Sequence, residues 1–195
     1  MRIISGSARG KKLESLQVSA LRPMLDRVKE SLFNILREAV VDVCVLDLFS
    51  GAGGLGLEAL SRGADWCTFV ERDGRLADLV RRNAEACRVA DRCVVLQRDA
   101  LALAGAMPPG GRPVDVVFAD PPYDMVDDPN ARAQLFAALE GLIGAWARPG
   151  ALVVLHHRPM PYALWPGARL AEVDHRIYGQ SQLTFFRADA EADDG

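Results

Sequence analysis

The feature that most constrains the fold is a regular alternation of short apolar runs and helical patterns that starts at Val43. The apolar runs predict strands at Val43–Phe49, Trp66–Glu71, Cys93–Gln97, Val114–Ala119 and Ala151–His156, and the patterns between them predict helices at Leu55–Arg62, Arg75–Cys87 and Ala131–Trp146. Strands that alternate with helices form a parallel sheet, because each parallel connection needs a crossover. The sequence therefore predicts an α/β fold with a doubly wound, mostly parallel sheet.

The two ends of the chain carry shorter elements of another kind. The turn-rich stretch SGSARG lies between Arg2–Ile4 and Lys12–Leu13 and predicts a small hairpin, followed by a helix at Leu25–Val41. Arg169–Tyr178 and Gln182–Arg187 flank the turn GQS and predict a C-terminal antiparallel pair, which brings the sheet to seven strands. We expect three parts: a basic arm and helix at 1–41, the main domain at 42–187, and an acidic disordered tail at 188–195.

Charge is distributed unevenly along the chain. The formal net charge of the 195 residues is −3, yet residues 1–37 hold eight basic side chains against three acidic ones, a local net charge of +5. The last eight residues, ADAEADDG, carry four acids and no base. A basic segment on a near-neutral body can bind nucleic acid or can be an ordinary solvated face, and charge alone leaves both open.

Composition also bears on the localisation of the protein, on disulfides and on metal binding. No apolar run approaches the roughly 18 residues of a membrane span, and the first residues lack the apolar stretch of a signal peptide, so a cytoplasmic protein without membrane contact is expected. The four cysteines form no C-x-x-C pair, which predicts buried, reduced thiols. His156 and His157 are adjacent and His175 is remote, so we expect no metal and place all three at a strand end or the surface.

A glycine-rich loop follows the first predicted strand, in the stretch DLFSGAGGLG. Gly51 to Gly56 reads as a literal G-x-G-x-x-G, the dinucleotide-binding fingerprint. The lead-in Asp-x-Phe-x-Gly is instead typical of S-adenosylmethionine (SAM) loops. A carboxylate at Asp47 suits the ammonium group of SAM and would repel a pyrophosphate. Gly51 and Gly53 let the backbone approach a ligand closely, so Asp47, Phe49, Gly51 and Gly53 are candidate cofactor-binding residues.

Polar residues also end the second and third predicted strands. Glu71 lies 20 residues after Gly51, where an acid can accept from both hydroxyls of a nucleoside ribose. The stem of Arg72 can lie along an adenine face, although a surface ion pair explains it almost as well. At Asp99–Ala100 a carboxylate and a backbone N–H can meet the adenine ring, and Asp99 can also cap the next helix.

The fourth predicted strand ends in Asp120-Pro121-Pro122-Tyr123, the most specific motif in the chain. Two consecutive prolines fix the backbone and remove two N–H donors. The Asp120 carboxylate and the Pro121 carbonyl remain as acceptors, which suit a planar amino group with two hydrogens to donate. Tyr123 offers a flat face on which a base can stack. These four residues are the candidate catalytic residues.

These motifs together resemble the amino-methyltransferases, SAM-dependent enzymes with a (D/N/S)-P-P-(Y/F/W) motif. From about Met1 to Arg187 the chain is most similar to the RsmD-type guanine-N2 methyltransferases of 16S ribosomal RNA. The shared segments are Arg2-Ile3-Ile4-x-Gly6, Arg9–Leu13, Arg22-Pro23, the helix from Asp26 to Leu36, the loop Asp47–Ala64, Asp120–Tyr123, and Tyr178-Gly179 with Leu183. Met24 departs from the pattern, which usually has Thr there, and Asp26 is a possible replacement cap.

The resemblance implies a function. It predicts a seven-stranded SAM-methyltransferase sheet, SAM as cofactor, and methylation of N2 of one guanine in 16S rRNA, on a partly assembled small subunit, by a monomer. The RNA phosphates would be held by the basic residues of the N-terminal segment, namely Arg9, Lys11, Lys12, Arg22 and Arg27.

Other functions fit parts of the pattern. An adenine-N6 methyltransferase of RNA or DNA would use the same motif, because D-P-P-Y itself does not select guanine. An NAD-dependent oxidoreductase would explain G-x-G-x-x-G with Glu71 but not the proline turn. A non-catalytic RNA-binding module would explain only the basic arm.

Overall fold

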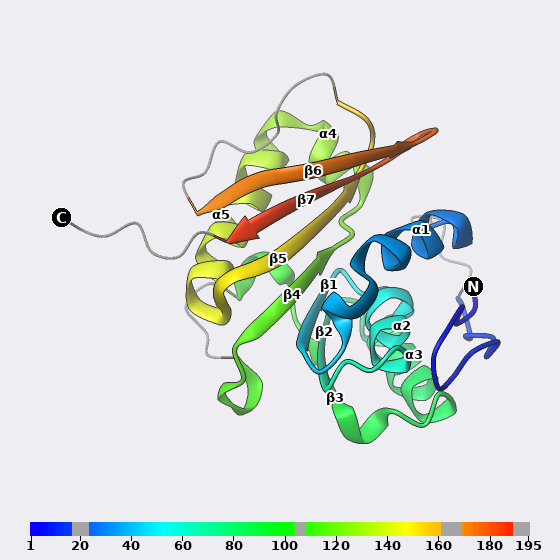
Figure 1. Cartoon of the computed structure of the whole chain (residues 1–195). Helices are drawn as coiled ribbons and strands as arrows, with labels where there is room; N and C mark the ends of the chain where they lie inside the picture. The colour runs from blue at the N-terminus through cyan, green and yellow to red at the C-terminus, as the bar shows by residue number, and fades with distance from the viewer. Residues whose placement is uncertain (17–23, 104–107, 161–168, 189–195) are drawn as a thin grey trace. The chain divides into compact units, whose positions relative to one another are not determined.

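The computed structural model describes residues 1–16, 24–103, 108–160 and 169–188 (Figure 1). Two compact units are present, Met1–Ala100 and Leu101–Gly195. Arg22 and residues 189–195 of the predicted acidic tail lie outside the described residues. The predicted boundaries at 41 and 187 remain predictions.

The first unit contains a three-stranded parallel sheet with strand order β3-β2-β1. Its elements are α1 Asp26–Leu36, η1 Arg37–Val40, β1 Cys44–Leu48, α2 Gly54–Ser61, β2 Trp66–Glu71, α3 Gly74–Ala86, η2 Ala90–Arg92 and β3 Cys93–Gln97, with η3 Ala100–Ala102 following. Helix α2 packs against β1 and β2, and α3 packs against β2 and β3. These are the alternating elements that the sequence predicts.

Burial explains why these segments fold as they do. Four of the five β1 residues and five of the six β2 residues are buried, whereas β3 is half-buried or exposed, as suits the edge of the sheet. Every residue of α2 is buried. Helix α3 buries Leu76, Leu79, Val80 and Asn83 on one face. Its N-cap is Asp73, whose side chain accepts from the Arg75 N–H at 2.9 Å.

The N-terminal segment forms the expected hairpin and helix, with two corrections. The hairpin contains the antiparallel bridge Arg2↔Lys12. The helix expected to run to Val41 ends at Leu36, because Arg37 adopts φ +46° and the chain continues as a 3-10 turn. Asp26 is not the cap: the N-cap is Leu25, without a side-chain bond, and Asp26 instead faces Arg2 at 3.7 Å. Met24, at the position that departs from the family pattern, is buried.

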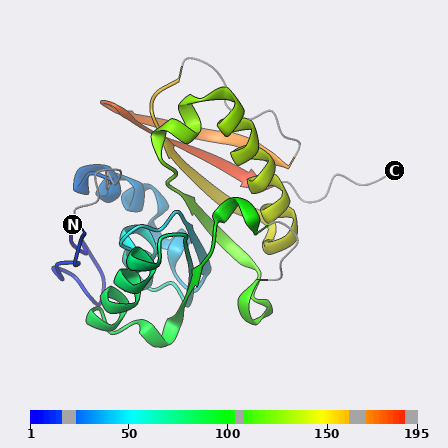
Figure 2. The same ribbon diagram turned by 180° about the vertical axis from the view of Figure 1, so that it is seen from behind.

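The second unit contains a four-stranded sheet with order β4-β5-β7-β6. Its elements are η4 Pro109–Gly111, β4 Val114–Ala119, α4 Tyr123–Asp127, α5 Pro129–Trp146, β5 Ala147–His157, β6 Leu170–Tyr178 and β7 Ser181–Ala188. Strands β4 and β5 are parallel, and β5, β7 and β6 pair antiparallel. Helices α4 and α5 lie behind this sheet in Figure 1 and in front of it in Figure 2, so they cover one of its faces.

Several elements of the second unit differ from the prediction, although β6 and β7 differ by no more than one residue at each end. Helix α4 was not predicted; it follows directly from the proline turn. Helix α5 begins at Pro129 rather than Ala131, because Asp128 caps it by accepting from the Ala131 N–H at 2.8 Å. Strand β5 begins at Ala147, opposite Val114, rather than at the predicted Ala151, and Gly150, at φ +79°, lies within the strand.

The predicted fold class is confirmed. Strands β1 to β5 alternate with helices, the pairs β1–β2, β2–β3 and β4–β5 are parallel, and the described part of the chain ends in the antiparallel hairpin β6–β7. In the described part of the chain, no helix is both long and apolar enough to span a bilayer.

Candidate active-site residues

The loop between β1 and α2 is a tight turn built from residues with positive φ. Phe49, Gly51 and Gly53 have φ values of +58°, +56° and +82°. The turn is held by the Gly53 N–H, which donates to the Ser50 carbonyl at 2.7 Å, and by the Ser50 N–H, which donates to Val70 at 3.1 Å. A left-handed backbone conformation is energetically costly for a non-glycine residue such as Phe49, and backbone strain of this kind is typical of functional loops. The predicted cofactor loop therefore has the backbone that close approach of a ligand needs.

Glu71, at the end of β2, is bound to this loop. One carboxylate oxygen accepts from the Gly51 N–H at 2.9 Å and the other from the Asp73 N–H at 2.9 Å, and the side chain is only 8% exposed. A carboxylate has about four acceptor positions, so each oxygen can take a further hydroxyl. The structure thus holds Glu71 at the glycine loop, and its contact with a ribose remains a prediction.

Asp47 accepts a backbone hydrogen bond that was not predicted from the sequence. Its carboxylate is 1% exposed and accepts from the Gly56 N–H, in the first turn of α2, at 2.8 Å. An acid at this position stabilises the start of the helix by satisfying a free N–H and by complementing the helix dipole. The predicted contact of Asp47 with an ammonium group remains a prediction.

The remaining predicted cofactor residues follow β2 and β3. In the register of these strands Glu71 pairs with Gln97, so both strands end at the same edge of the sheet. Arg72 and Asp99 are exposed there, and Ala100 is buried. The structure therefore gathers these residues at the carboxyl edge of the parallel strands, where such sheets bind ligands.

The proline motif of the second unit forms a rigid connection from β4 to α4. Strand β4 ends at Ala119 and α4 begins at Tyr123, with Pro122 as its N-cap. Pro121 is buried, Pro122 is exposed and Tyr123 is half-buried. The side chain of Asp120 is 24% exposed. The turn thus keeps the acid and the tyrosine partly accessible on a fixed backbone.

His156 joins these two side chains, and sequence reasoning missed it. Its Nδ1 lies 2.7 Å from Asp120 Oδ1, and its Nε2 lies 3.4 Å from the Tyr123 hydroxyl. The same hydroxyl lies 3.3 Å from Ser181 Oγ. His156 is 3% exposed, near the end of β5. The available signal was its place at the end of the predicted strand that follows D-P-P-Y, where carboxyl-end residues of parallel strands meet.

Arg158 covers part of Tyr123. Its guanidinium carbon lies 4.9 Å from the centre of the tyrosine ring, and it forms an ion pair with Asp127. A cation placed over an aromatic ring is attracted by the π electrons. A base that stacks on this face of Tyr123 would therefore have to displace Arg158 or pack against it.

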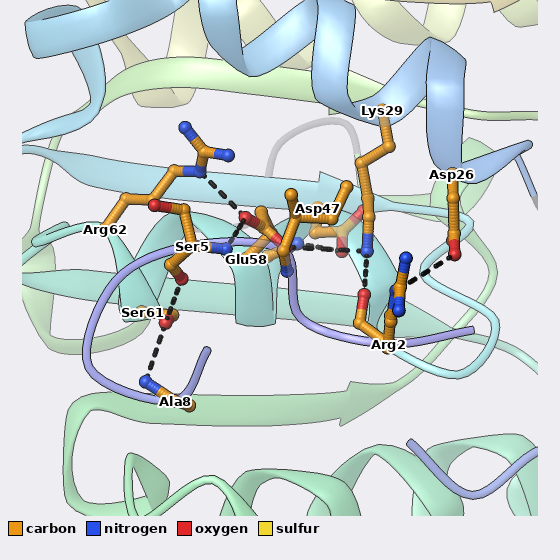
Figure 3. Close-up of polar contacts among 11 residues, drawn as sticks. Arg2, Ser5, Ala8, Asp26, Lys29, Asp47, Glu58, Ser61 and Arg62 are labelled. Atoms are coloured by element: carbon orange, nitrogen blue, oxygen red, sulfur yellow. Dashed lines mark hydrogen bonds and ion pairs between the residues drawn. The ribbon is translucent and has the colours of Figure 1, made fainter. Parts of the chain in front are cut away.

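Four of the predicted RNA-binding residues are exposed, whereas Lys29 of the same segment is buried. Arg9, Lys11 and Lys12 are exposed in the N-terminal hairpin, and Arg27 is exposed on α1. Lys29 is 1% exposed; its ammonium donates to the Arg2 carbonyl at 2.6 Å and lies 3.5 Å from the Glu58 carboxylate (Figure 3). Burial lowers the pKa of Lys29, while Glu58 opposes that shift. Part of the local charge of +5 is therefore internal.

The hairpin is fixed to α2 through its backbone. The N–H groups of Ile4 and Ser5 donate to the Glu58 carboxylate at 2.7 and 3.0 Å. Ser61 Oγ donates to the Ser5 carbonyl at 2.6 Å and accepts from the Ala8 N–H at 2.9 Å (Figure 3). The exposed cations thus project from a segment with a defined conformation.

The cysteines are reduced in the structure. Cys67 and Cys87 are buried, and Cys44 and Cys93 are half-buried. Burial raises the pKa of Cys93 to about 11, and burial together with the nearby charge of Asp47 raises the pKa of Cys67 well above its usual value. Among the residues that the structure describes, no three His, Cys, Asp or Glu side chains are grouped as metal ligands would be.

Comparison with known proteins identifies relatives along nearly the whole chain. The model of the family described as Conserved hypothetical protein 95 matches residues 1–187. A Haemophilus influenzae protein named ribosomal RNA small subunit methyltransferase D is 37% identical over 154 residues, covering 78% of this chain and 76% of its own length. The Escherichia coli protein of the same name is 41% identical over 123 residues, which span 63% of this chain and 60% of the relative.

A solved structure matches over a longer range. The structure of yhhF from Escherichia coli superposes with a TM-score of 0.82 at 30% sequence identity, and the match covers 98% of this chain and 99% of that one. The chain therefore shares its fold with the Escherichia coli protein over almost its full length.

Proposed function

We propose, from the premise that this chain belongs to the Conserved hypothetical protein 95 family, that it methylates N2 of a guanine in 16S ribosomal RNA. The family membership confirms the resemblance to RsmD-type methyltransferases, and relatives that carry the name ribosomal RNA small subunit methyltransferase D support the substrate class.

The cofactor is S-adenosylmethionine, and the first unit has the residues to hold it. Gly51 and Gly53 allow close approach of the backbone, and Glu71 is held beside them with acceptor capacity for a ribose. Bound SAM supplies a methyl group that its sulfonium already activates. The chain itself then needs neither a nucleophile nor a metal, and its contribution is to bind and orient the reactants.

The second unit has the residues to orient the base. Asp120 Oδ1 is engaged by His156, and Oδ2 has no hydrogen-bond partner within the described ranges, so Oδ2 can accept from the exocyclic amine. The Pro121 carbonyl accepts the second amine hydrogen, and Tyr123 stacks on the base after it leaves its own stack. These two bonds turn the nitrogen lone pair out of conjugation with the ring, and the released proton goes to Asp120 or water.

The single observation that carries this proposal is the partly exposed carboxylate of Asp120, fixed by a buried histidine beside a half-buried tyrosine. The RNA contacts are assigned to Arg9, Lys11, Lys12 and Arg27 on the described surface, with Arg22 as a further candidate. We assign the protein to the cytoplasm as a monomer, acting on a partly assembled small subunit. Methylation of an adenine N6 is the alternative that mapping of the product distinguishes.

The test is transfer of labelled methyl from SAM to small ribosomal subunits from a strain that lacks this gene, followed by mapping of the modified base. Asp120→Ala is expected to abolish transfer while calorimetry gives an unchanged affinity for SAM. Asp124→Ala, an exposed acid on the neighbouring α4, is the matched control and should remain active. Loss of SAM binding in parallel with activity would contradict the separate roles, and a labelled adenine would contradict the guanine assignment.

A further inference from the structure

A chain of polar contacts runs through the second unit from Ser181 to Asp120. Ser181 Oγ contacts the Tyr123 hydroxyl at 3.3 Å, that hydroxyl contacts His156 Nε2 at 3.4 Å, and His156 Nδ1 contacts Asp120 Oδ1 at 2.7 Å. The rings of Tyr123 and His156 meet edge to face, with centres 5.7 Å apart. Two residues from the proline motif are thus joined by one histidine from a different strand.

The strand register explains why His156 meets Asp120. In the parallel pair β4–β5, Ala119 lies opposite Leu155, so the next residues along each strand are Asp120 and His156. On its other side His156 pairs with Leu183 of the antiparallel strand β7. The imidazole is only 3% exposed and is therefore held by the sheet on both sides.

The hydrogen positions follow from the chemistry of the partners. An ionised carboxylate can only accept, so Nδ1 of His156 must carry the proton that it donates to Asp120. In the neutral ring Nε2 is then an acceptor, which the Tyr123 hydroxyl can satisfy as donor. Tyr123 in turn can accept from the Ser181 hydroxyl. Every donor in the chain then has an acceptor, and the imidazole has one tautomer.

We propose that His156 is a positioning residue that fixes Asp120 for methyl transfer. This rests on the proposed function, in which Asp120 accepts a hydrogen from the target amine. The bond from Nδ1 to Oδ1 stops rotation of the carboxylate and directs Oδ2 to the amine. Through Nε2 the same ring links the stacking residue Tyr123 to the acceptor Asp120, so one buried side chain sets the orientation of both.

Two amide variants separate the two nitrogen contacts of the ring. In His156→Asn the amide nitrogen falls near the position of Nδ1 and can still donate to Asp120. In His156→Gln the amide falls near Nε2 and reaches Tyr123 instead. We expect His156→Ala and His156→Gln to lower kcat for methyl transfer roughly 10- to 100-fold, because a misplaced reacting group is that costly. His156→Asn should recover most of the rate, with an unchanged Kd for SAM in all three.

If His156→Ala does not fold, the comparison of kcat between His156→Asn and His156→Gln still tests the proposal. His175→Ala, an exposed histidine on β6, is the control for loss of an imidazole and should have wild-type kcat. Equal rates for His156→Asn and His156→Gln, or wild-type kcat in His156→Ala, would overturn the proposal. So would a loss of SAM affinity that matches the loss of rate.

A measurement without turnover separates this proposal from the proposed function. Ring-nitrogen NMR of the wild-type protein should find the proton of His156 on Nδ1, and Asp120→Ala should shift that signal. A His156 ring without a proton on Nδ1 would overturn the proposal even if the enzyme is active. A wild-type protein that methylates no ribosomal RNA would instead contradict the function and leave the tautomer result standing.

Discussion

Lys29 and Glu58 form an ion pair that is closed to solvent. The two charged groups lie 3.5 Å apart, and their side chains are 1% and 0% exposed. Lys29 comes from α1 and Glu58 from α2, and each also binds backbone of the N-terminal hairpin. Arg62 is a further partner of Glu58, at 2.8 Å (Figure 3). Three segments of the first unit therefore depend on one buried cluster of charges.

Removal of one charge from this cluster should be costly. Lys29→Met leaves the Glu58 carboxylate buried with one cation fewer, and such changes destabilise proteins by about 3–5 kcal/mol. Urea unfolding should show that loss. Asp26→Asn, which breaks the exposed contact of Asp26 with Arg2, is the control and should cost less than about 1 kcal/mol. Equal losses of unfolding free energy in Lys29→Met and Asp26→Asn would show that the buried Lys29–Glu58 pair stabilises the fold no more than an exposed contact does.

Two glycines of the hairpin form a matched pair for testing how it is attached. Gly6 and Gly10 have nearly the same backbone, with φ +84° and +81°. A Cβ at Gly6 would lie 1.8 Å from the Ser61 carbonyl oxygen, whereas a Cβ at Gly10 would meet nothing within 4 Å. Gly10→Ala should therefore cost only the conformational penalty of about 1–2 kcal/mol.

Gly6→Ala should in addition displace the hairpin from α2. We expect trypsin to cleave after Arg9, Lys11 and Lys12 much faster in Gly6→Ala than in Gly10→Ala, because these residues would then lie in a detached segment. Similar cleavage rates would mean that the hairpin adapts to the extra methyl group without leaving α2.

His157 makes stability sensitive to acid. The ring is fully buried, donates from Nδ1 to the Arg158 carbonyl and accepts from Thr184 at Nε2. Burial lowers the pKa of His157 from 6.5 to about 4. Between these two values the unfolded chain binds a proton that the folded chain does not, so stability falls as the pH falls from about 6.5 to about 4. The loss amounts to about 3 kcal/mol.

The measurement is the unfolding free energy of wild type and His157→Asn from pH 7 to pH 4. The variant lacks the titrating ring, so the gap between the two proteins should narrow as the pH falls. His175→Asn removes an exposed histidine and should run parallel to wild type. A gap that stays constant across the range would show that His157 does not carry the acid sensitivity.

The basic hairpin should determine how RNA binding responds to salt. Arg9→Gln, Lys11→Gln and Lys12→Gln, made singly, should each lower the slope of log Kd against log salt by about 0.7–0.9 if the side chain contacts a phosphate. Arg176→Gln, on the exposed strand β6, is the control. Filter binding to 16S rRNA fragments at several salt concentrations gives the slopes. Slopes equal to wild type in all three variants would exclude the hairpin as a phosphate-binding element.

Local pattern was enough to predict much of this protein. The bounds of β2, β3 and β4 agree with the prediction, because each strand is a short, mainly apolar run between polar or turn-forming residues. The glycine loop and the proline turn were also predictable from the sequence, since glycine and proline affect the backbone conformation at and next to their own positions. Boundaries set by a single dihedral angle or a cap, such as the end of α1 at Leu36, could not be predicted from the sequence.

Only the tertiary structure decided which distant side chains meet. His156 is a polar residue at a strand end in the sequence, and the register of β4 with β5 makes it the partner of Asp120. Lys29 counts as one more basic residue in the sequence, and packing of α1 and the hairpin on α2 turns it into a buried ion. Periodicity reports which face of an element is apolar, whereas pairing across elements depends on register and packing between residues far apart in the chain.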